Sequence, residues 1–545
     1  MATAVAGRRA KKRQVLVGST TPRVFTPPAV DGPPGPCGCG CALTDGTSLG
    51  FDVDEFSKEA VGVDLFPWQR WLLIHMLELN EDGMLRFRKV VVLVARQNGK
   101  SLLAEILALY FMYALRAKLV LGTAQDLSTA EDVWQDTLDL ASESEFLAPQ
   151  LTKPKFGKGG KEFGIVDRGT YKVKAANRRG GRGARQAKLV LLDELREHQS
   201  WDAWGAITKT TNAVPEAMIL ALSNAGDATS VVLRYLRLMA HKRLGDPDGI
   251  VADSDPTALV DASVDGVDED GGVDDEDDSL ALFEWSAKPG ADVRDRGGWA
   301  QANPSMPHTV NERTLRSDVN TDPEWVFRTE CLCQWSDGAL DGPFPPGAWD
   351  AGKMDQGDVA MFPMVDERPV ACIEVSHDRA RAAIVYAGYR SDGLPMAEVV
   401  RYRYDPDTVI DWLKSPERTT TPRKIAIRKT GPAANLGEQL EREGFEVEWW
   451  TGADVSTACG ALYDAVRGGE DDVCGPLRHT AHTALDIAAA TAATTPYGDR
   501  WSWDMAKSAT DISPLFAMTG AFWLLEKPTE EPKRSAYEDR GVLTI

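Results

Sequence analysis

A short apolar strand that leads directly into a loop and a helix constrains the fold of this chain most. Residues 90–94 are Val-Val-Val-Leu-Val, residues 95–99 are Ala-Arg-Gln-Asn-Gly, and a helix-forming run starts at Lys100. A phosphate-binding loop needs this order, because its amide groups and the helix N-terminus together face the anion. The segment therefore predicts such a loop, although Val94 replaces the first glycine of the common pattern. The loop residues expected at a nucleotide are Arg96, Gln97, Asn98, Gly99, Lys100 and Ser101.

Apolar runs alternate with helical stretches from residue 51 to about residue 243. The runs fall at 89–94, 118–122, 188–192 and 217–222, and each precedes a helical pattern. Continuous apolar strands separated by helices are typical of a parallel sheet that is covered on both faces. The sequence thus predicts an α/β domain.

A second apolar run ends in two adjacent acids. Residues 188–192 are Lys-Leu-Val-Leu-Leu, and Asp193 and Glu194 follow. This is the pattern of a Walker B strand, in which Asp193 would hold Mg²⁺ and Glu194 would orient and deprotonate the attacking water. With Lys100 set to contact the β- and γ-phosphates and Ser101 to ligate Mg²⁺, ATP and Mg²⁺ are the expected cofactors.

Three further segments fit the same site. The side-chain amide of Gln69 is expected to read the adenine edge, and Ser223 and Asn224 follow the strand at 217–222 and would lie beside the γ-phosphate. Four arginines lie at 178–185, before the Walker B strand, and Arg182 is the first choice for an arginine finger. A contact of this loop with the DNA backbone and a solvated loop stay open as alternatives.

The net charge of −21 is concentrated in one segment. Residues 253–278 hold twelve acids and no Lys or Arg, so the rest of the chain carries −9. This segment lacks core-forming residues and is expected to be a solvated insertion. Residues 1–50, rich in Pro and Gly, are expected to form a disordered arm.

Cysteine use and hydropathy exclude two other classes of protein. Eight cysteines in 545 residues are too sparse for a disulfide scaffold, and the longest apolar run is broken by Glu105, so no membrane span is expected. Cys37, Cys39 and Cys41 form a cluster, but their C-x-C-x-C spacing and the lack of a nearby His in the sequence favour a loop over a metal site.

Taken together, the motifs resemble those of the large terminase subunit of tailed phages. The resemblance covers residues 60–525 and rests on four segments in order: 67–69 (Pro-Trp-Gln), 96–101 (Arg-Gln-Asn-Gly-Lys-Ser), 192–194 (Leu-Asp-Glu) and 299–305 (Trp-Ala-Gln-Ala-Asn-Pro-Ser). It implies a ring-forming ATPase domain of the additional-strand type and an RNase H-like nuclease domain, and it gives Arg96 a role at the nucleotide phosphates. The expected domains are an arm (1–50), the ATPase core (51–245), the acidic insertion (246–282), a linking subdomain (283–340), the nuclease domain (341–527) and a polar tail (528–545).

The resemblance also implies nuclease metal ligands, and here the chain departs from the family pattern. Strands expected at 371–375, 382–389 and 396–404, followed by alternating helix and strand, indicate a mixed sheet. Glu374 stands where the first Asp is usual, Arg428 stands at the second acidic position, and Asp511 matches the third. Glu374 and Asp511 are thus the expected ligands of Mg²⁺ or Mn²⁺, but Arg428 would repel a divalent cation, so weak or absent cleavage is expected.

The partners that the resemblance implies are double-stranded DNA, the capsid portal, a small terminase subunit and further copies of the chain in a ring. The expected location is the cytoplasm of an infected bacterium, outside the mature virion. Two alternatives stay open: a helicase-like nucleic-acid-dependent ATPase, and a packaging or docking subunit that does not cleave DNA.

Overall fold

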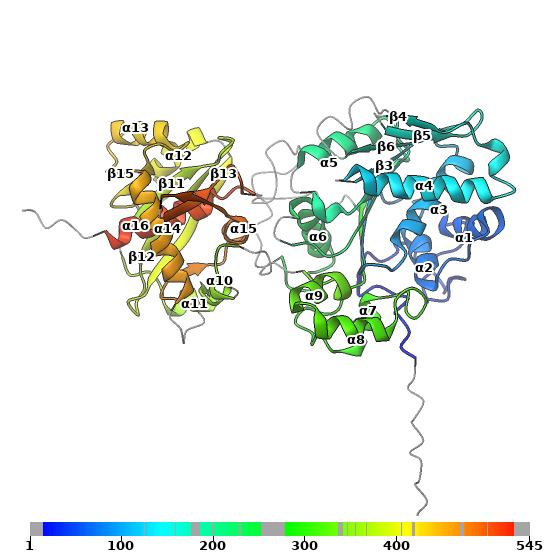
Figure 1. The fold of residues 1–545 in the computed structure, drawn as a ribbon, viewed down its shortest axis with the longest axis horizontal. Coiled ribbons are helices and arrows are strands. Elements are labelled where there is room, and N and C mark those ends of the chain that lie inside the picture. Colours follow the sequence, from blue (N-terminus) through cyan, green and yellow to red (C-terminus); the bar gives the residue numbers. More distant parts are fainter. Residues whose placement is uncertain are drawn as a thin grey trace, which may run out of the picture. The chain divides into compact units, whose positions relative to one another are not determined.

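The computed structural model divides the chain into two compact units, Met1–Leu340 and Asp341–Ile545, and each is described by itself. Figure 1 shows the helices and strands of both units. The residues that the structure describes are 15–124, 126–157, 160–175, 186–198, 201–227, 230–251, 278–335, 342–345, 347–354, 356–366, 368–404, 406–416, 420–468, 474–498, 500–508 and 510–527. Among them, no helix is both long and apolar enough to span a bilayer.

The first unit is built on a nine-stranded mixed sheet. Its strand order is β1-β9-β2-β8-β7-β3-β6-β5-β4. The six strands from β9 to β6 are parallel to their neighbours, and antiparallel strands complete both edges. The strands are β1 (Val24–Phe25), β2 (Lys89–Leu93), β3 (Leu119–Ala124), β4 (Lys155–Gly157), β5 (Gly160–Gly164), β6 (Thr170–Ala175), β7 (Leu189–Asp193), β8 (Met218–Ser223) and β9 (Leu280–Glu284).

Helices alternate with the strands, as the sequence predicts, and α1 and α2 precede the first parallel strand, β2. They are α1 (Gly50–Phe56), α2 (Pro67–Met76), α3 (Lys100–Tyr113), α4 (Leu127–Glu143), α5 (Trp201–Thr208) and α6 (Val231–Arg243). Nearly every side chain of α3 is buried, because its sequence is apolar on all sides rather than on one stripe. α4 is amphipathic and contacts α3, β3 and β6 with its apolar face. The main core of the unit lies between these helices and the sheet.

Three short helices follow β9 and form a small subdomain with its own core. They are α7 (Arg296–Ala302), α8 (Glu312–Thr321) and α9 (Glu324–Leu332), and both α7 and α8 contact α9 (Figure 1). Their apolar side chains surround Trp299 and Phe327. All three helices lie within residues 283–340, the range expected for the linking subdomain.

Residues 15–50 differ from the disordered arm that their composition favours. β1 pairs with β9, Leu43 is fully buried, and Phe25 packs edge-on against Trp71 at 5.2 Å between ring centroids. The guanidinium of Arg23 donates to Asp248 at 2.5 Å and to Glu284 at 3.1 Å. These few apolar and charged contacts hold residues 15–50 in place. The high Pro and Gly content of the segment makes them hard to recognise in the sequence.

The acidic insertion is shorter than the sequence predicts. Residues 252–277 lie outside the described residues, but residues 280–284 form β9, which lies between β1 and β2 and is parallel to β2. Glu284 ends β9 and is buried. Burial alone would raise the pKa of its carboxyl group, but Arg237 and Arg23 hold that pKa well below its usual range. The insertion therefore interrupts the sheet instead of following it.

The second unit contains a seven-stranded mixed sheet in the order β10-β16-β13-β12-β11-β14-β15. β11, β12 and β13 are successive antiparallel strands, whereas β14 and β15 run parallel to β11. These are the three strands followed by mixed α/β structure that the sequence predicts for an RNase H-like domain. The strands are β10 (Lys353–Met354), β11 (Val370–Val375), β12 (Arg381–Tyr389), β13 (Pro395–Tyr404), β14 (Ile425–Arg428), β15 (Val447–Trp450) and β16 (Arg478–Thr480), with a separate hairpin of β17 (Ala493–Tyr497) and β18 (Arg500–Asp504).

One apolar helix covers the centre of this sheet. α16 contacts β11, β12, β13 and β14, and almost all of its side chains are buried. The helices are α10 (Ala348–Ala351), α11 (Gln356–Met361), α12 (Val409–Lys414), α13 (Ala434–Arg442), α14 (Gly452–Arg467), α15 (Thr483–Thr491) and α16 (Ser513–Glu526). The strand β11 is buried on both sides, so its only charged side chain, Glu374, has no exposed surface.

Candidate active site

The predicted phosphate loop connects β2 to α3. Gly99 precedes the first helical residue with a φ of +88°, a left-handed conformation that glycine adopts without strain. Gln97 also has a positive φ, of +60°. The first turn of α3 contains no acidic residue. The loop and the positive end of the helix dipole thus lie where an anion is stabilised.

Lys100 is the buried cation of this site. Its ammonium group donates to the carbonyl of Val94 at 3.2 Å and to Oδ1 of Asn224. Burial lowers the pKa of Lys100, and the nearby carboxylates of Glu194 and Asp193 oppose that shift. A buried cation that relies on a backbone carbonyl and an amide for its hydrogen bonds gains from an added anion.

The two acids of the Walker B strand lie at the same edge of the sheet as the loop. β8 is placed between β2 and β7, so the carboxyl ends of three neighbouring parallel strands meet. Burial, and then repulsion by Glu194, raises the pKa of Asp193. Glu194 has a φ of +50°, and its amide donates to Oδ1 of Asp193 at 3.0 Å. This sharp turn after the strand holds the two carboxylates apart while both stay near Lys100.

Ser223 and Asn224 end the middle strand, as the sequence predicts, and both are fully buried. The Ser223 hydroxyl accepts from the amide of Arg196 at 3.1 Å. Asn224 accepts from Lys100 and donates from Nδ2 to Glu330 at 3.0 Å. Asn224 therefore connects the phosphate-loop lysine to a carboxylate of the helical subdomain.

Glu330 on α9 is a site residue that the sequence motifs do not reveal. Its carboxylate accepts from Arg196 at 2.8 Å and pairs with Nε of Arg96 at 2.7 Å, in addition to the bond from Asn224. The side chain of Arg96 is 57% exposed. Both arginines lie within reach of the nucleotide site, and in this structure a protein carboxylate holds them.

Gln69 and Asn98 contact the loop itself. Gln69 accepts from the amide of Phe66 at 2.9 Å and donates to the carbonyl of Gly99 at 2.9 Å. Asn98 is fully buried, donates to Asn303 at 3.1 Å and accepts from the amide of Ser305 at 3.0 Å. Their side chains thus position the phosphate loop against α2 and the helical subdomain, and adenine recognition by Gln69 stays a prediction.

The other predicted residues divide into two groups. Ser101 and Gln97 are exposed at the start of α3 and in the loop, respectively, where a ligand can reach them. Arg182 lies outside the described residues, as does the whole arginine-rich segment. Its assignment as an arginine finger stays a prediction.

The chemistry of the site fits ATP and Mg²⁺. One buried ammonium group, an exposed hydroxyl on Ser101 and the carboxylate of Asp193 are the donors that a magnesium nucleotide requires. Oε2 of Glu194 is buried and accepts no hydrogen bond among the described residues, although it lies 3.2 Å from Nε of Arg196. The role of Glu194 as the base for a water molecule stays a prediction.

The second unit brings its predicted acids to a different environment. Glu374 on β11 accepts from Nε of Arg428 at 2.9 Å, and β11 and β14 are neighbours in the sheet. The guanidinium of Arg428 also lies 4.3 Å above the ring of Phe516 and donates to the sulfur of Met505 at 3.2 Å. Burial raises the pKa of Glu374, and Arg428 opposes that shift. The arginine thus places a positive charge directly beside the buried carboxylate.

Asp511 lies close enough to Glu374 to affect its ionisation, but it has its own partners. The Tyr402 hydroxyl donates to Oδ2 at 3.0 Å, and the amide and hydroxyl of Ser513 each donate at 2.9 Å. Asp378, a conceivable substitute ligand, is exposed and accepts from Ser376 in a tight turn. Protein donors therefore satisfy Glu374, Asp378 and Asp511.

Comparison with solved structures gives several large terminases of phages as structural neighbours. The HK97 bacteriophage large terminase has a TM-score of 0.49 and 17% identity, over 88% of this chain and all of that chain. The ATPase domain of a Thermus phage large terminase has a TM-score of 0.33 and 14% identity, over 52% of this chain and 98% of that chain. A large terminase from a thermophilic bacteriophage, in complex with ATP-γ-S, has a TM-score of 0.30 and 9% identity, over 87% and 98%.

No protein-family model and no curated protein matches the chain. These three structural neighbours are large terminases of phages, the family that the four sequence motifs also resemble. At these identities and TM-scores the likeness assigns no role to any residue, so the roles proposed below rest on the contacts within this chain.

Proposed function

We propose that this chain is the large subunit of a phage terminase, and that it hydrolyses ATP to drive double-stranded DNA into a capsid. The observation that carries the proposal is the meeting of Lys100, Asp193 and Asn224 at the carboxyl ends of β2, β7 and β8. A buried cation, a metal-ligating acid and a polar sensor beside a phosphate loop are the parts of an ATP-hydrolysing site.

Each residue has a separate task in this proposal. Lys100 binds the β- and γ-phosphates, Ser101 and Asp193 hold Mg²⁺, and Glu194 accepts the proton of the attacking water. The Mg²⁺ ion, when bound, offsets negative charge on the phosphate oxygens. Arg96 is free to leave Glu330 for the phosphates, because its guanidinium is largely exposed.

Asn224 and Glu330 supply a route from hydrolysis to movement. Asn224 contacts Lys100 on one side and Glu330 on the other, so loss of the γ-phosphate changes the contacts of a helix in the α7–α9 subdomain. The proposed partners of this movement are double-stranded DNA, the capsid portal, a small terminase subunit and neighbouring copies in a ring, in the cytoplasm of the infected cell. Arg182 is proposed as the finger that reaches the nucleotide in its own or an adjacent copy.

For the second unit we propose an RNase H-like domain with impaired cleavage. Glu374 and Asp511 are the family positions for Mg²⁺ or Mn²⁺, but the buried pair of Glu374 with Arg428 occupies the place of the second acid. A divalent cation would have to displace a guanidinium that is bonded to the carboxylate and packed on Phe516.

The motor proposal is tested with the full chain and its Lys100→Ala variant. Wild-type protein should hydrolyse ATP with Mg²⁺ and should respond to double-stranded DNA, whereas Lys100→Ala should lose most of its turnover because the γ-phosphate is no longer held. Lys89→Ala, at the other end of β2, is the matched control and should keep turnover. No hydrolysis by the wild type with DNA and Mg²⁺ present would refute the proposal.

The proposal for the second unit is tested by plasmid nicking with Mn²⁺. Wild type should cut poorly, and Arg428→Asp should cut faster, because the change restores a ligand and removes a repelling charge. Asp511→Ala in the Arg428→Asp background should remove the gain. Robust cutting by wild type that Arg428→Asp abolishes would show that this site is not impaired.

A further inference from the structure

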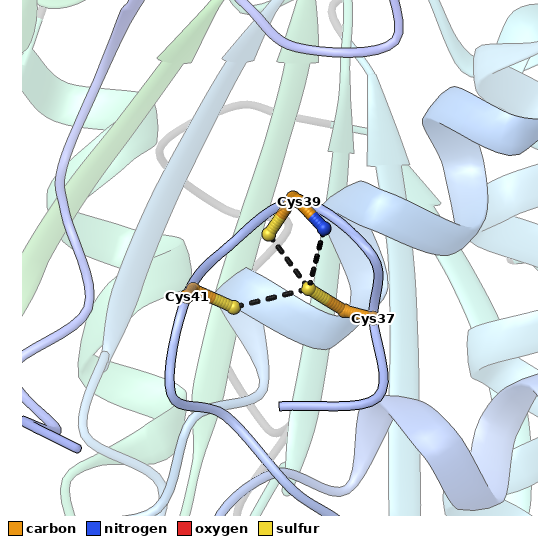
Figure 2. Close-up of side chains that lie close together, drawn as sticks. All are labelled: Cys37, Cys39 and Cys41. Atoms are coloured by element: carbon orange, nitrogen blue, oxygen red, sulfur yellow. Dashed lines mark hydrogen bonds between the residues drawn. The ribbon is translucent and has the colours of Figure 1, made fainter. Parts of the chain in front are cut away.

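The cysteine cluster near the N-terminus is brought to a single point by its loop. Gly38 and Gly40 have φ angles of +80° and +94°, and these left-handed residues turn the chain between each pair of cysteines. Figure 2 shows the side chains of Cys37, Cys39 and Cys41 pointing toward one another. Their sulfur atoms all lie within 4.8 Å of one another, with 2.6 Å from Cys37 to Cys39 and 3.1 Å from Cys37 to Cys41.

A histidine that is distant in the sequence lies beside this cluster. His75, in the last turn of α2, is only 2% exposed, and its Nε2 atom is 3.6 Å from the sulfur of Cys39. Its Nδ1 atom is 2.7 Å from the carbonyl oxygen of Trp71. Because a carbonyl can only accept, Nδ1 carries the proton, and the lone pair of Nε2 faces the sulfur of Cys39.

The histidine ring is also held in place before any ligand binds. It stacks on Trp71 with 3.7 Å between ring centroids and an angle of 16° between planes. A backbone carbonyl on one ring nitrogen, with the other nitrogen turned toward thiols, is the arrangement that orients metal-binding histidines.

We propose that Cys37, Cys39, Cys41 and His75 bind one Zn²⁺ ion. Three thiols and one imidazole are a ligand set that favours zinc in tetrahedral coordination. With zinc–sulfur bonds of about 2.3 Å and zinc–nitrogen bonds of about 2.0 Å, a sulfur and a nitrogen ligand lie about 3.6 Å apart and two sulfurs about 3.8 Å apart. The distance from Cys39 to His75 already has the first value.

The sulfur atoms must move apart by about 1 Å to reach the second value. The loop permits this adjustment, because nothing lies within 4 Å of the positions that side chains at Gly38 and Gly40 would occupy. His75 provides the fixed side of the site, and the loop provides the adaptable side.

The proposed ion fastens the N-terminal segment to the ATPase domain. Three ligands lie on the loop that precedes Leu43, and the fourth lies on α2, the helix that also carries Gln69 against the phosphate loop. Zinc would therefore hold residues 15–49 on the same helix that supports the nucleotide site. This inference does not depend on the proposed motor function.

The ion is tested by measuring metal content on the full chain, purified under reducing conditions without an affinity tag that binds metal. Wild type should contain about one zinc per chain. Cys39→Ser, Cys41→Ser and His75→Gln should each lose most of it, and Cys474→Ser, which changes a partly exposed cysteine of the second unit, should keep it. Replacement by Co²⁺ should give the thiolate-to-cobalt and d–d bands of a tetrahedral site.

A chelation experiment keeps the test valid where a variant fails to fold. Removal of zinc from wild type should lower its melting temperature, and stoichiometric Zn²⁺ should restore it, with no such response in Cys39→Ser. Absence of stoichiometric zinc together with failure to take up Zn²⁺ or Co²⁺ would overturn the proposal. So would an intact mass 2 Da lower under these conditions with no metal, which would indicate a disulfide between two of the three cysteines.

Discussion

The two units both bury charge at the carboxyl end of a central strand, but they neutralise it differently. In the first unit, Lys100 is a buried cation that donates to a backbone carbonyl and an amide, with the acids Asp193 and Glu194 nearby. In the second unit, Glu374 is a buried carboxylate with a guanidinium bonded directly to it. One site has functional groups left for a ligand, and the other has already paired its charge within the protein.

This difference has a physical cause in how a buried charge is compensated. A buried carboxylate costs free energy unless a cation is close, and either a metal ion or an arginine can be that cation. Here Arg428 is that cation, because its guanidinium is bonded to Glu374. At the nucleotide site, the carboxylate of Glu330 pairs with Arg96 and Arg196, whereas the hydrogen-bond partners of Lys100 are a carbonyl and an amide.

The largest expected effect tests whether Glu194 is the base of the first site. Glu194→Gln should reduce ATP turnover by about 10²- to 10⁴-fold, the usual contribution of a general base, because the amide cannot accept the proton of water. ATP binding should be kept, since Lys100 is unchanged. Steady-state hydrolysis and binding of a fluorescent ATP analogue measure the two effects.

Glu197→Gln is the matched control for this variant. Glu197 lies in the same turn and also pairs with Arg196 at 3.2 Å, but its side chain is 53% exposed. Its removal should leave turnover close to wild type. Equal turnover of Glu194→Gln and Glu197→Gln would show that Glu194 is not the base.

The second prediction concerns the buried pair of Glu374 and Arg428 in the second unit. Arg428→Ala should destabilise that unit by about 3–5 kcal/mol, because it leaves Glu374 buried without its cation. Hydrogen exchange of peptides from β11 under increasing denaturant measures the local free energy of unfolding.

A second substitution separates charge from packing in that experiment. Glu374→Gln combined with Arg428→Ala should recover part of the loss, since no uncompensated carboxylate is then buried. If the single and double variants have the same stability, the pair does not stabilise β11, and the contrast between the two sites fails.

The parts of the fold that the sequence predicts are those with continuous apolar runs. β2, β7 and β8 lie within one residue of the expected runs, because a strand buried on both faces needs apolar residues throughout. β9 is missed because its five residues directly follow the acidic segment and precede a helical pattern. β4, β5 and β6 are missed because Gly, Lys and Thr interrupt their apolar residues.

Site residues, too, are predictable where a local sequence pattern marks them. Lys100, Asp193 and Asn224 are predictable, because each lies in a local pattern at the end of a strand. Glu330 is one acid in a short helix, and only the fold brings it to Arg96 and Arg196. His75 is likewise separated from Cys39 by 36 residues, so its position beside the cysteine cluster gives no signal in the spacing.

The third prediction tests whether Glu330 competes with the nucleotide for arginines. Glu330→Gln should tighten ATP binding by about fivefold, because a partly exposed ion pair of about 1 kcal/mol no longer holds Arg96 and Arg196 away from phosphate. Titration with an ATP analogue and Mg²⁺ gives the dissociation constants.

Glu324→Gln on the same helix is the control, since Glu324 pairs with Arg328 and is 64% exposed. It should bind ATP as wild type does. Weaker binding by Glu330→Gln would show that Glu330 supports the site instead of competing for its arginines.

The smallest expected effect is that of removing the acidic segment. It tests whether this segment contributes to the nucleotide site. Replacing residues 253–277 with a short Gly-Ser linker should change basal ATP turnover by no more than about twofold, as expected where the removed chain has no core-forming residues. The linker must keep Asp278, which pairs with Arg86 at 2.7 Å, and must let β9 re-enter beside β2. Turnover and melting temperature, measured together, separate two outcomes. Lost turnover in a variant that still melts like wild type would place the acidic residues in the chemistry, whereas a lower melting temperature would mean that they help β9 to join the sheet.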